Sequence, residues 1–336
     1  MTNIFVHALE GMPDDPIGFT GKSERDIRVR WLVGEPVGSG PWRVDTTRTT
    51  SNGLVLVRQG GKPKPECIDE VHLPFIPNGN ELKVKLLSGE IHFAPTLTDP
   101  SAIAPLKINP DIVVKKTGGI SIFFLAFRKG VDVKLRGAIA RAINRHKLAE
   151  LGKEAASLAT GLIPPPMIGH DWGMVEPPST PISEPGSLVL LCPPKNTFAR
   201  SLAEEVRNQV NSATRIIVQL PDPSSNWKVM NEEWKGGKGD LLIASWHQRD
   251  DHSDDPANYL RAIFHSKGSA NWGRYDTVDA HLDKGHHKDA VDQIKADIPV
   301  LPLVYWHRHS AYRSAVQNLD LLPGALPADR LVNVIV

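Results

Sequence analysis

The feature that most constrains the fold is a regular alternation of short apolar runs with helical stretches in the second half of the chain. Residues 188–192, 215–220 and 240–246 are apolar runs with the length of buried strands. Between them, residues 198–210 have the spacing of an amphipathic helix, and residues 225–238 are helical in character but contain glycines. Parallel neighbours in a sheet need such crossover helices, so this order predicts an α/β layered lobe with a partly parallel sheet.

A second pattern, at residues 120–148, predicts a strand that leads into a helix. Residues 120–127 are rich in aromatic and aliphatic side chains, as in a buried strand. A short break follows at residues 128–130. Apolar residues then recur at helical spacing over residues 133–148, with arginine and lysine between them, which predicts one amphipathic helix.

The first part of the chain is predicted to consist mainly of strands. The runs that favour strands are residues 42–44, 54–58, 68–75 and 112–116. Residues 81–88 predict a short helix, because Gly89 suits the left-handed position that ends many helices, and a strand is expected up to residue 93. Near the other end, residues 290–297 predict a short helix.

Composition excludes some classes of function. The chain has 336 residues, ample for two lobes, and its 39 lysines and arginines nearly balance its 38 aspartates and glutamates. No overall field therefore favours nucleic acid or an anionic membrane. No run approaches the ~20 apolar residues that span a bilayer. Cys67 and Cys192 lie far apart in the sequence, and whether they pair depends on a distance that the sequence does not give.

Several of these segments resemble the extracellular solute-binding proteins, family 5, which serve peptide and nickel ABC importers. The resemblance rests on three segments: PVGSGPWRV at residues 36–44, the pattern RxAxAxAINR at residues 136–145, and the run from Trp246 to Leu260. Two positions depart from the family, since Trp42 replaces tyrosine and Arg128 replaces the usual asparagine. The resemblance implies an α/β, two-lobed, periplasmic-binding-protein-like (type II) fold with mixed sheets.

The same resemblance implies where the two lobes divide. Residues 1–127 with 310–336 would form a discontinuous first lobe, and residues 128–309 the second. Family members carry a longer segment before the motif at residues 36–44, so we expect the first lobe to lack its usual N-terminal part. The N-terminus also lacks the basic start and apolar core of a signal peptide.

The strongest candidate for a ligand site follows the run at residues 240–246. Ligands of open α/β sheets bind outside the carboxyl ends of the strands, and here Trp246 is followed by an acidic segment that contains Asp250 and Asp251. A carboxylate beside an aromatic ring can hold an ammonium group by a charge-assisted hydrogen bond. The resemblance implies that one of these two aspartates grips a peptide N-terminus. The alternative is a solvated acidic loop in which Asp254 or Asp255 caps the following helix.

Further residues are expected at the ligand by resemblance. They are Phe124, Phe127, Arg128, Trp272 and Tyr305. Trp272 and Tyr275 could equally pack within a lobe. The pairs His286–His287 and His307–His309 invite a metal ion, but without a third ligand at a defined spacing we interpret them as surface or packing residues. We therefore expect no metal site and no cofactor.

These observations predict a binding protein and not an enzyme, because no nucleophile with a base, nucleotide loop or metal triad has a recognisable spacing. By resemblance, we expect the substrate-binding component of an ABC importer, which holds a peptide or similar small polar ligand in a cleft between two lobes. Its partner would be a membrane permease, with no nucleic acid bound and a monomeric state. Its location would be the periplasm or cell envelope, although the missing signal peptide leaves the cytoplasm open. The alternatives are a solute-sensing domain of a cytoplasmic transcriptional regulator and a truncated relative without a transport role.

Overall fold

The computed structural model describes residues 4–6, 9–10, 41–76, 79–95, 97, 100–165, 167–173, 185–194, 196–247, 256–319, 331 and 334–336. Contacts divide the chain into unit 1 (Met1–Gly118 with Arg308–Val336) and unit 2 (Gly119–His307). The division falls within two long strands, β7 (Ile112–Phe127) and β12 (Val300–Arg313). The lobe limits drawn from the sequence, 1–127 with 310–336 and 128–309, stay a prediction. No helix in the described ranges has the length and apolar character needed to cross a bilayer.

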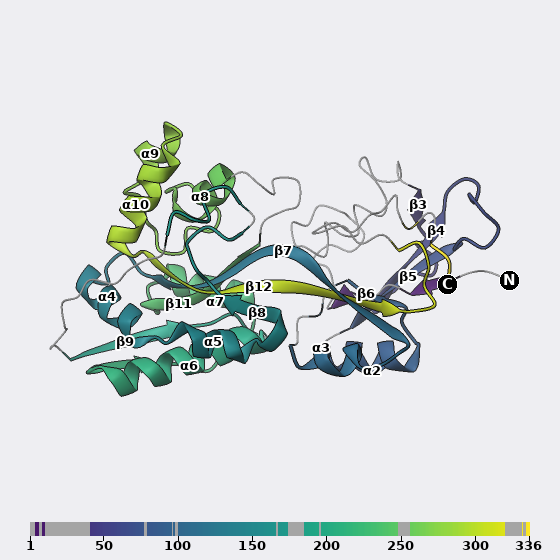
Figure 1. The fold of residues 1–336 in the computed structure, drawn as a ribbon, viewed down its shortest axis with the longest axis horizontal. Helices are drawn as coiled ribbons and strands as arrows, with labels where there is room; N and C mark the ends of the chain where they lie inside the picture. Colours follow the sequence, from purple (N-terminus) through teal and green to yellow (C-terminus); the bar gives the residue numbers. More distant parts are fainter. Residues whose placement is uncertain are drawn as a thin grey trace. The chain divides into compact units, whose positions relative to one another are not determined.

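Unit 1 is built on a sheet with the strand order β1-β5-β4-β3, in which β2 also pairs with β5. The strands are β1 (Ile4–Val6), β2 (Leu9–Glu10), β3 (Trp42–Val44), β4 (Gly53–Arg58) and β5 (Glu70–Ile76). Alternate residues of the antiparallel pair β4 and β5 are buried, as expected for a sheet with one face on a core, and Trp42 is fully buried in that core. Figure 1 shows the helices α2 (Gly79–Ser88) and α3 (Pro100–Lys107) side by side, and β6 (Phe93–Ala94) pairs with β12.

Unit 2 contains the mixed sheet that positions the candidate site. Its strands follow the order β10-β9-β11-β7-β12, with β8 paired to β12. The remaining bounds are β8 (Ala156–Leu158), β9 (Gly186–Leu191), β10 (Ile216–Gln219) and β11 (Leu241–His247). Both β10 and β11 pair parallel with β9, whereas β7 pairs antiparallel with β11. The partly parallel sheet predicted from the alternation of strands and helices is therefore confirmed.

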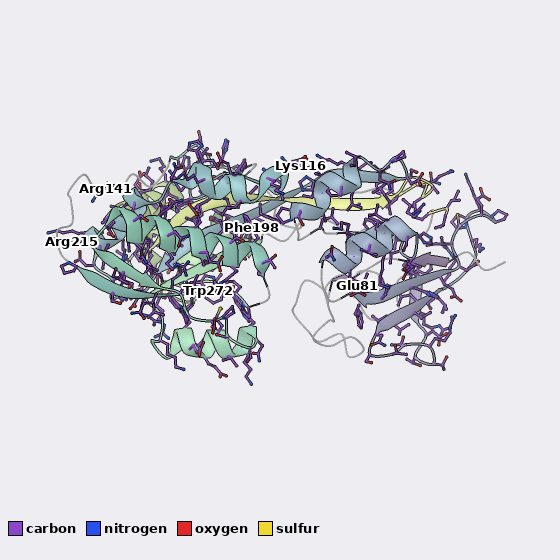
Figure 2. All side chains as sticks on the ribbon, turned by 90° about the horizontal axis from the view of Figure 1, so that it is seen from below. Glu81, Lys116, Arg141, Phe198, Arg215 and Trp272 are labelled. Carbon is purple, nitrogen blue, oxygen red and sulfur yellow. The ribbon has the colours of Figure 1, made fainter. Side chains whose placement is uncertain are left out.

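Unit 2 also contains helices, of which α6 contacts β9, β10 and β11 (Figures 1 and 2). They are α4 (Val133–Ala142), α5 (Arg145–Leu151), a short 3-10 helix (Lys153–Ala155), α6 (Thr197–Ala213), α7 (Trp227–Lys235), α8 (Pro256–Phe264), α9 (Asp279–Asp283) and α10 (His287–Asp297). The longest, α6, is amphipathic as predicted, and the Asn196 side chain caps its start by accepting the Ala199 N–H at 2.9 Å. Phe198, labelled in Figure 2, packs edge-on against Phe123 of β7 with 5.3 Å between ring centroids.

The structure corrects the sequence analysis at several elements. The single helix predicted over residues 133–148 is two helices, because Ile143 adopts an extended conformation and the Asn144 side chain accepts the backbone N–H groups of His146 and Lys147. Asparagine competes well for such caps, so it starts a new helix where the apolar spacing continues. The strands predicted separately at 112–116 and 120–127 form one strand, β7. Helix α3 was missed, because Pro100 and Pro105 look like breaks.

Candidate functional site

Strand β11 leads the chain to the ligand site predicted at Trp246. Residues Leu241 to Ala244 are fully buried, and Trp246 near the strand end is half-buried. The Trp246 ring packs edge-on against Tyr259 of α8, with 4.7 Å between ring centroids and 77° between ring planes. Because β11 runs parallel to β9, Trp246 lies at the carboxyl end of the parallel strands, where α/β sheets bind their ligands.

The predicted ligand carboxylates, Asp250 and Asp251, lie outside the described residues. So do Asp254 and Asp255, which were considered as caps of the following helix. Helix α8 begins at Pro256, so a helix does follow these aspartates, as expected from the sequence. The acidic segment is therefore flanked by β11 and α8, which meet through the ring contact of Trp246 and Tyr259.

Two buried tyrosines anchor a loop beside this strand end. The Tyr305 hydroxyl accepts the Gly161 N–H at 2.9 Å and lies 3.1 Å from the Gly161 carbonyl oxygen and 3.3 Å from that of Ile163. The Tyr259 hydroxyl donates to the Leu162 carbonyl. Burial raises the pKa of both phenols, so both hydroxyls stay protonated near neutral pH. The two tyrosine hydroxyls therefore hold the loop 161–163 through hydrogen bonds to its backbone groups.

The two phenylalanines predicted at the ligand belong to the core of unit 2. Phe124 and Phe127 are each 1% exposed. In the antiparallel register of β7 and β11, Phe124 lies opposite Ala244 and Phe127 opposite Leu241. The structure gives these two rings a packing role, because almost none of their surface is accessible.

Arg128, also predicted at the ligand, joins the end of β7 to α7. Its guanidinium donates to the backbone carbonyls of Gly239 and Trp234 and lies 4.3 Å from the centroid of the Trp234 ring. Its backbone N–H donates to the Asp240 carbonyl at 2.9 Å. Burial lowers the pKa of Arg128, but an arginine stays charged under these conditions. These contacts use the side chain to hold two backbone segments together.

Trp272, also predicted at the ligand, is half-buried and lies beside α7. Its ring meets that of Trp227 edge-on at 5.4 Å between centroids, and its carbonyl accepts the indole N–H of Trp234 at 2.8 Å. Its own indole N–H is buried and has no hydrogen-bond acceptor among the described residues. A buried donor of this kind favours a nearby acceptor, either water or a ligand.

The structure thus brings together only some of the predicted residues. Trp246 and Tyr305 share a cluster, since Tyr259 contacts Trp246 and both tyrosines bind the loop 161–163. Phe127 and Arg128 lie toward the opposite end of β11, because Leu241 and Trp246 are five positions, or about 17 Å, apart along that strand.

Sequence reasoning missed Tyr259, although a signal was available. Its spacing from the apolar residues Leu260, Ile263 and Phe264 matches one buried face of a helix, and all four are buried on α8. Among the described residues, the group of three possible metal ligands is His281, His286 and Asp289, which lie on α9 and at the start of α10. Cys67 and Cys192 are free thiols, both buried.

Comparison with known proteins agrees with this fold. Residues 2–271 match the family model described as bacterial extracellular solute-binding proteins, family 5 Middle. The chain belongs to this family, as its motifs predicted. No curated protein matches the chain.

Solved structures similar to this chain show its fold. A periplasmic binding protein, DppA of Helicobacter pylori in complex with the peptide STSA, has a TM-score of 0.72 and 18% identity over 93% of this chain and 65% of its own. MoaA of A. tumefaciens with mannopinic acid has a TM-score of 0.70 and 17% identity over 89% and 66% of the respective chains. NikA of Staphylococcus aureus with Ni(L-His)2 has a TM-score of 0.68 and 15% identity over 89% and 69%.

These likenesses establish the two-lobed periplasmic-binding-protein fold class that the sequence predicted. The chain spans less than two thirds of the length of the Helicobacter pylori protein, at 65%. The three bound molecules differ in chemistry, so the fold alone does not select the ligand.

Proposed function

We propose that this protein is the substrate-binding component of an ABC importer and binds a peptide or similarly small polar ligand. The observation that carries the proposal is the family match over residues 2–271. Further support comes from similar structures that hold the peptide STSA, mannopinic acid and Ni(L-His)2. The proposal includes a binding role without catalysis, a monomer in the cell envelope, and a membrane permease as partner.

Within this proposal, the ligand's ammonium group pairs with Asp250 or Asp251 next to the Trp246 ring. The supporting geometry is the half-buried ring at the carboxyl end of β11 and its contact with α8, the two elements that flank the acidic segment. A carboxylate near an aromatic face binds ammonium by charge and by hydrogen bonding. Trp272 accepts from Trp234 at the opposite end of β11, so the proposal gives it a packing role and no contact with this ligand.

The remaining predicted residues support the site indirectly in this proposal. Tyr305 holds the loop 161–163. Phe124 and Phe127 fill the core from β7, the strand next to β11. Arg128 replaces the family's usual asparagine and binds backbone carbonyls, so it is proposed as a brace and not as a ligand contact.

The test is native mass spectrometry of gently purified protein, followed by thermal-shift titration with a mixture of short peptides. The expected result is a co-purifying mass that leaves on unfolding, or a peptide that raises the melting temperature. In the double variant Asp250→Ala, Asp251→Ala this affinity should fall at least about tenfold, the usual cost of an unpaired charged group at a binding site. The matched control is Asp222→Ala, an exposed aspartate on another loop of unit 2.

An acetylated peptide sharpens the test, because acetylation removes the ammonium charge and leaves the rest of the ligand unchanged. The proposed contact predicts that the acetylated peptide binds weakly to the wild-type protein and equally weakly to the double variant. Equal affinity for both peptides would exclude the ammonium contact. A protein that carries no ligand and responds to no peptide would contradict the proposed function itself.

A further inference from the structure

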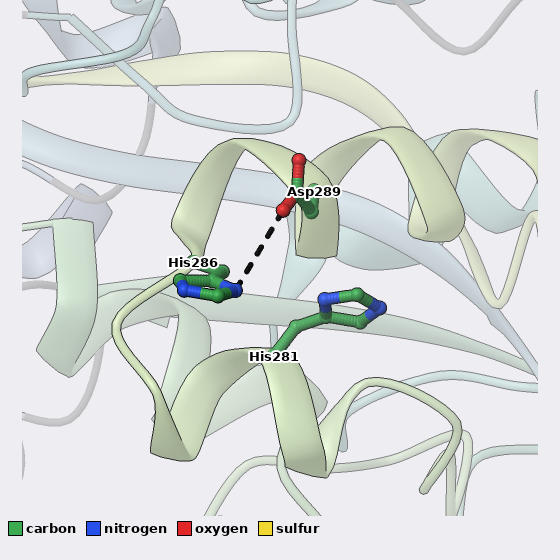
Figure 3. A group of neighbouring side chains, drawn as sticks. All are labelled: His281, His286 and Asp289. Carbon is green, nitrogen blue, oxygen red and sulfur yellow. Dashed lines mark ion pairs between the residues drawn. The ribbon is translucent and has the colours of Figure 1, made fainter.

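Helices α9 and α10 bring two histidines and one aspartate to a common point. His281 comes from α9, His286 precedes the first turn of α10, and Asp289 lies within that turn. One ligand atom of each residue lies within 4.8 Å of those of the other two. His286 Nδ1 is 3.8 Å from a carboxylate oxygen of Asp289. Figure 3 shows His281 on one helix, Asp289 on the other and His286 at the connection, with a dashed line between His286 and Asp289.

The chain positions these residues through the tight connection between the helices. The His286 N–H donates to the His281 carbonyl at 2.9 Å, and Gly285 has a positive φ of 74°, which glycine adopts without strain. The backbone, rather than the side chains, therefore fixes the approach of α9 to α10. The side chains of the cluster remain free to orient toward a ligand.

Neighbouring charges are already paired elsewhere. Asp283 of α9 accepts from Arg261 at 2.9 Å, and Lys288 of α10 donates to Asp292 at 2.6 Å. The His286 ring makes no capping hydrogen bond at the start of α10. Within the described ranges, the Asp289 carboxylate has an ion-pair partner only in His286. The cluster therefore keeps an anion and two imidazoles for another partner.

This donor set suits a divalent transition metal. Imidazole nitrogen and carboxylate oxygen bind zinc at about 2.0–2.2 Å, which places neighbouring ligand atoms roughly 3.4 Å apart in a tetrahedral site. The present atoms lie within 4.8 Å and none of the three side chains is buried, so side-chain rotations suffice to close the site. Oxygen-preferring calcium and magnesium are disfavoured by the two imidazoles.

We propose that His281, His286 and Asp289 form a binding site for a divalent transition metal of the zinc type, with water in the remaining positions. The site lies at a hollow of ≈ 490 Å³ whose lining includes His286 and Asp289 as well as Trp172 and Pro256. The bound ion joins α9 to α10 across their connection. It does not depend on the proposed peptide site.

The test is calorimetric titration of untagged, chelator-treated protein with Zn²⁺. We expect one ion per chain, and a dissociation constant raised at least about tenfold in His281→Ala and in Asp289→Asn, because each removes a direct ligand. The matched control is His287→Ala, since His287 lines the same hollow but lies outside the three-residue group. Its affinity should stay within about twofold of the wild-type value, in the ordinary range for surface positions.

A second readout separates metal binding from folding. Zn²⁺ should raise the melting temperature of the wild-type and His287→Ala proteins but not of the two ligand variants, since a ligand that binds only the folded state stabilises it. Without metal, all four proteins should melt alike, because none of the three substituted side chains is buried: Asp289 is exposed, and His281 and His287 are half-buried. Co²⁺ should give the visible spectrum of a nitrogen-containing site. Absent binding, several weak ions per chain, or equal loss in His287→Ala would each overturn the proposal.

Discussion

The two ends of strand β11 differ in burial and in hydrogen bonding. At the start, Phe127 packs opposite Leu241, and the guanidinium of Arg128 reaches two backbone carbonyls and the Trp234 ring. At the far end, Trp246 stays half-buried and the chain enters an acidic segment. The difference teaches that residues expected by resemblance to share one ligand site divide between a structural brace and a half-buried ring next to the proposed ligand contact.

The brace explains one departure of this chain from its family. Arginine at position 128 is longer than the usual asparagine and carries several donors in a planar fork, so it reaches carbonyls on both sides of α7's end. Burial of the cation has a cost, which is visible as a lowered pKa of Arg128. The hydrogen bonds to Gly239 and Trp234 offset that cost, which makes the start of β11 sensitive to substitution.

The largest effect is expected at the buried end. Phe127→Ala should lower the free energy of unfolding by about 4 kcal/mol, because it removes a fully buried ring and leaves a cavity. Trp246→Ala should cost clearly less, since its ring is already partly exposed. Denaturant unfolding followed by circular dichroism measures both. Equal losses would show that the two ends do not differ in packing.

A smaller loss is expected from the brace itself. Arg128→Met should reduce the free energy of unfolding by about 3 kcal/mol, because two carbonyls lose a charged donor and the ring contact weakens. The matched control is Lys129→Met, which removes the adjacent cation and its exposed pair with Asp276. The same unfolding experiment should show a much smaller change for the control. A comparable change in both variants would argue against the brace.

The sequence predicted elements better than it predicted contacts. The alternation around residues 188–246 set the parallel pairing of β9, β10 and β11, because buried strands joined by helices have few alternatives. The break between α4 and α5 could not be predicted from the spacing of apolar residues. It depends on Asn144, whose own N–H donates to the Gln209 side chain of α6, a contact between residues far apart in the sequence.

The candidate site shows the same limit. Resemblance selected Phe124, Phe127 and Tyr305 by their positions in motifs, but burial and hydrogen bonding depend on strand register and on the loop 161–163. The proposed metal site shows the same limit. In the sequence, His286 and His287 stand out as neighbours. In the structure, His286 lies instead with His281 and Asp289, because one turn of α10 and the connection to α9 bring those side chains together.

The smallest effect is expected for the loop beside Trp246. Tyr305→Phe keeps the ring and removes the hydroxyl that binds Gly161, so it should lower the free energy of unfolding by about 1–2 kcal/mol. The matched control is Tyr312→Phe, which should change stability little because the Tyr312 hydroxyl makes no hydrogen bond with another described residue. Since the loop lies beside the proposed ligand contact, Tyr305→Phe should also weaken peptide binding more than Tyr312→Phe does, measured by the same thermal-shift titration. A loss of stability with unchanged affinity would mean that the loop is held for the fold alone and would confine the proposed site to Trp246 and the acidic segment.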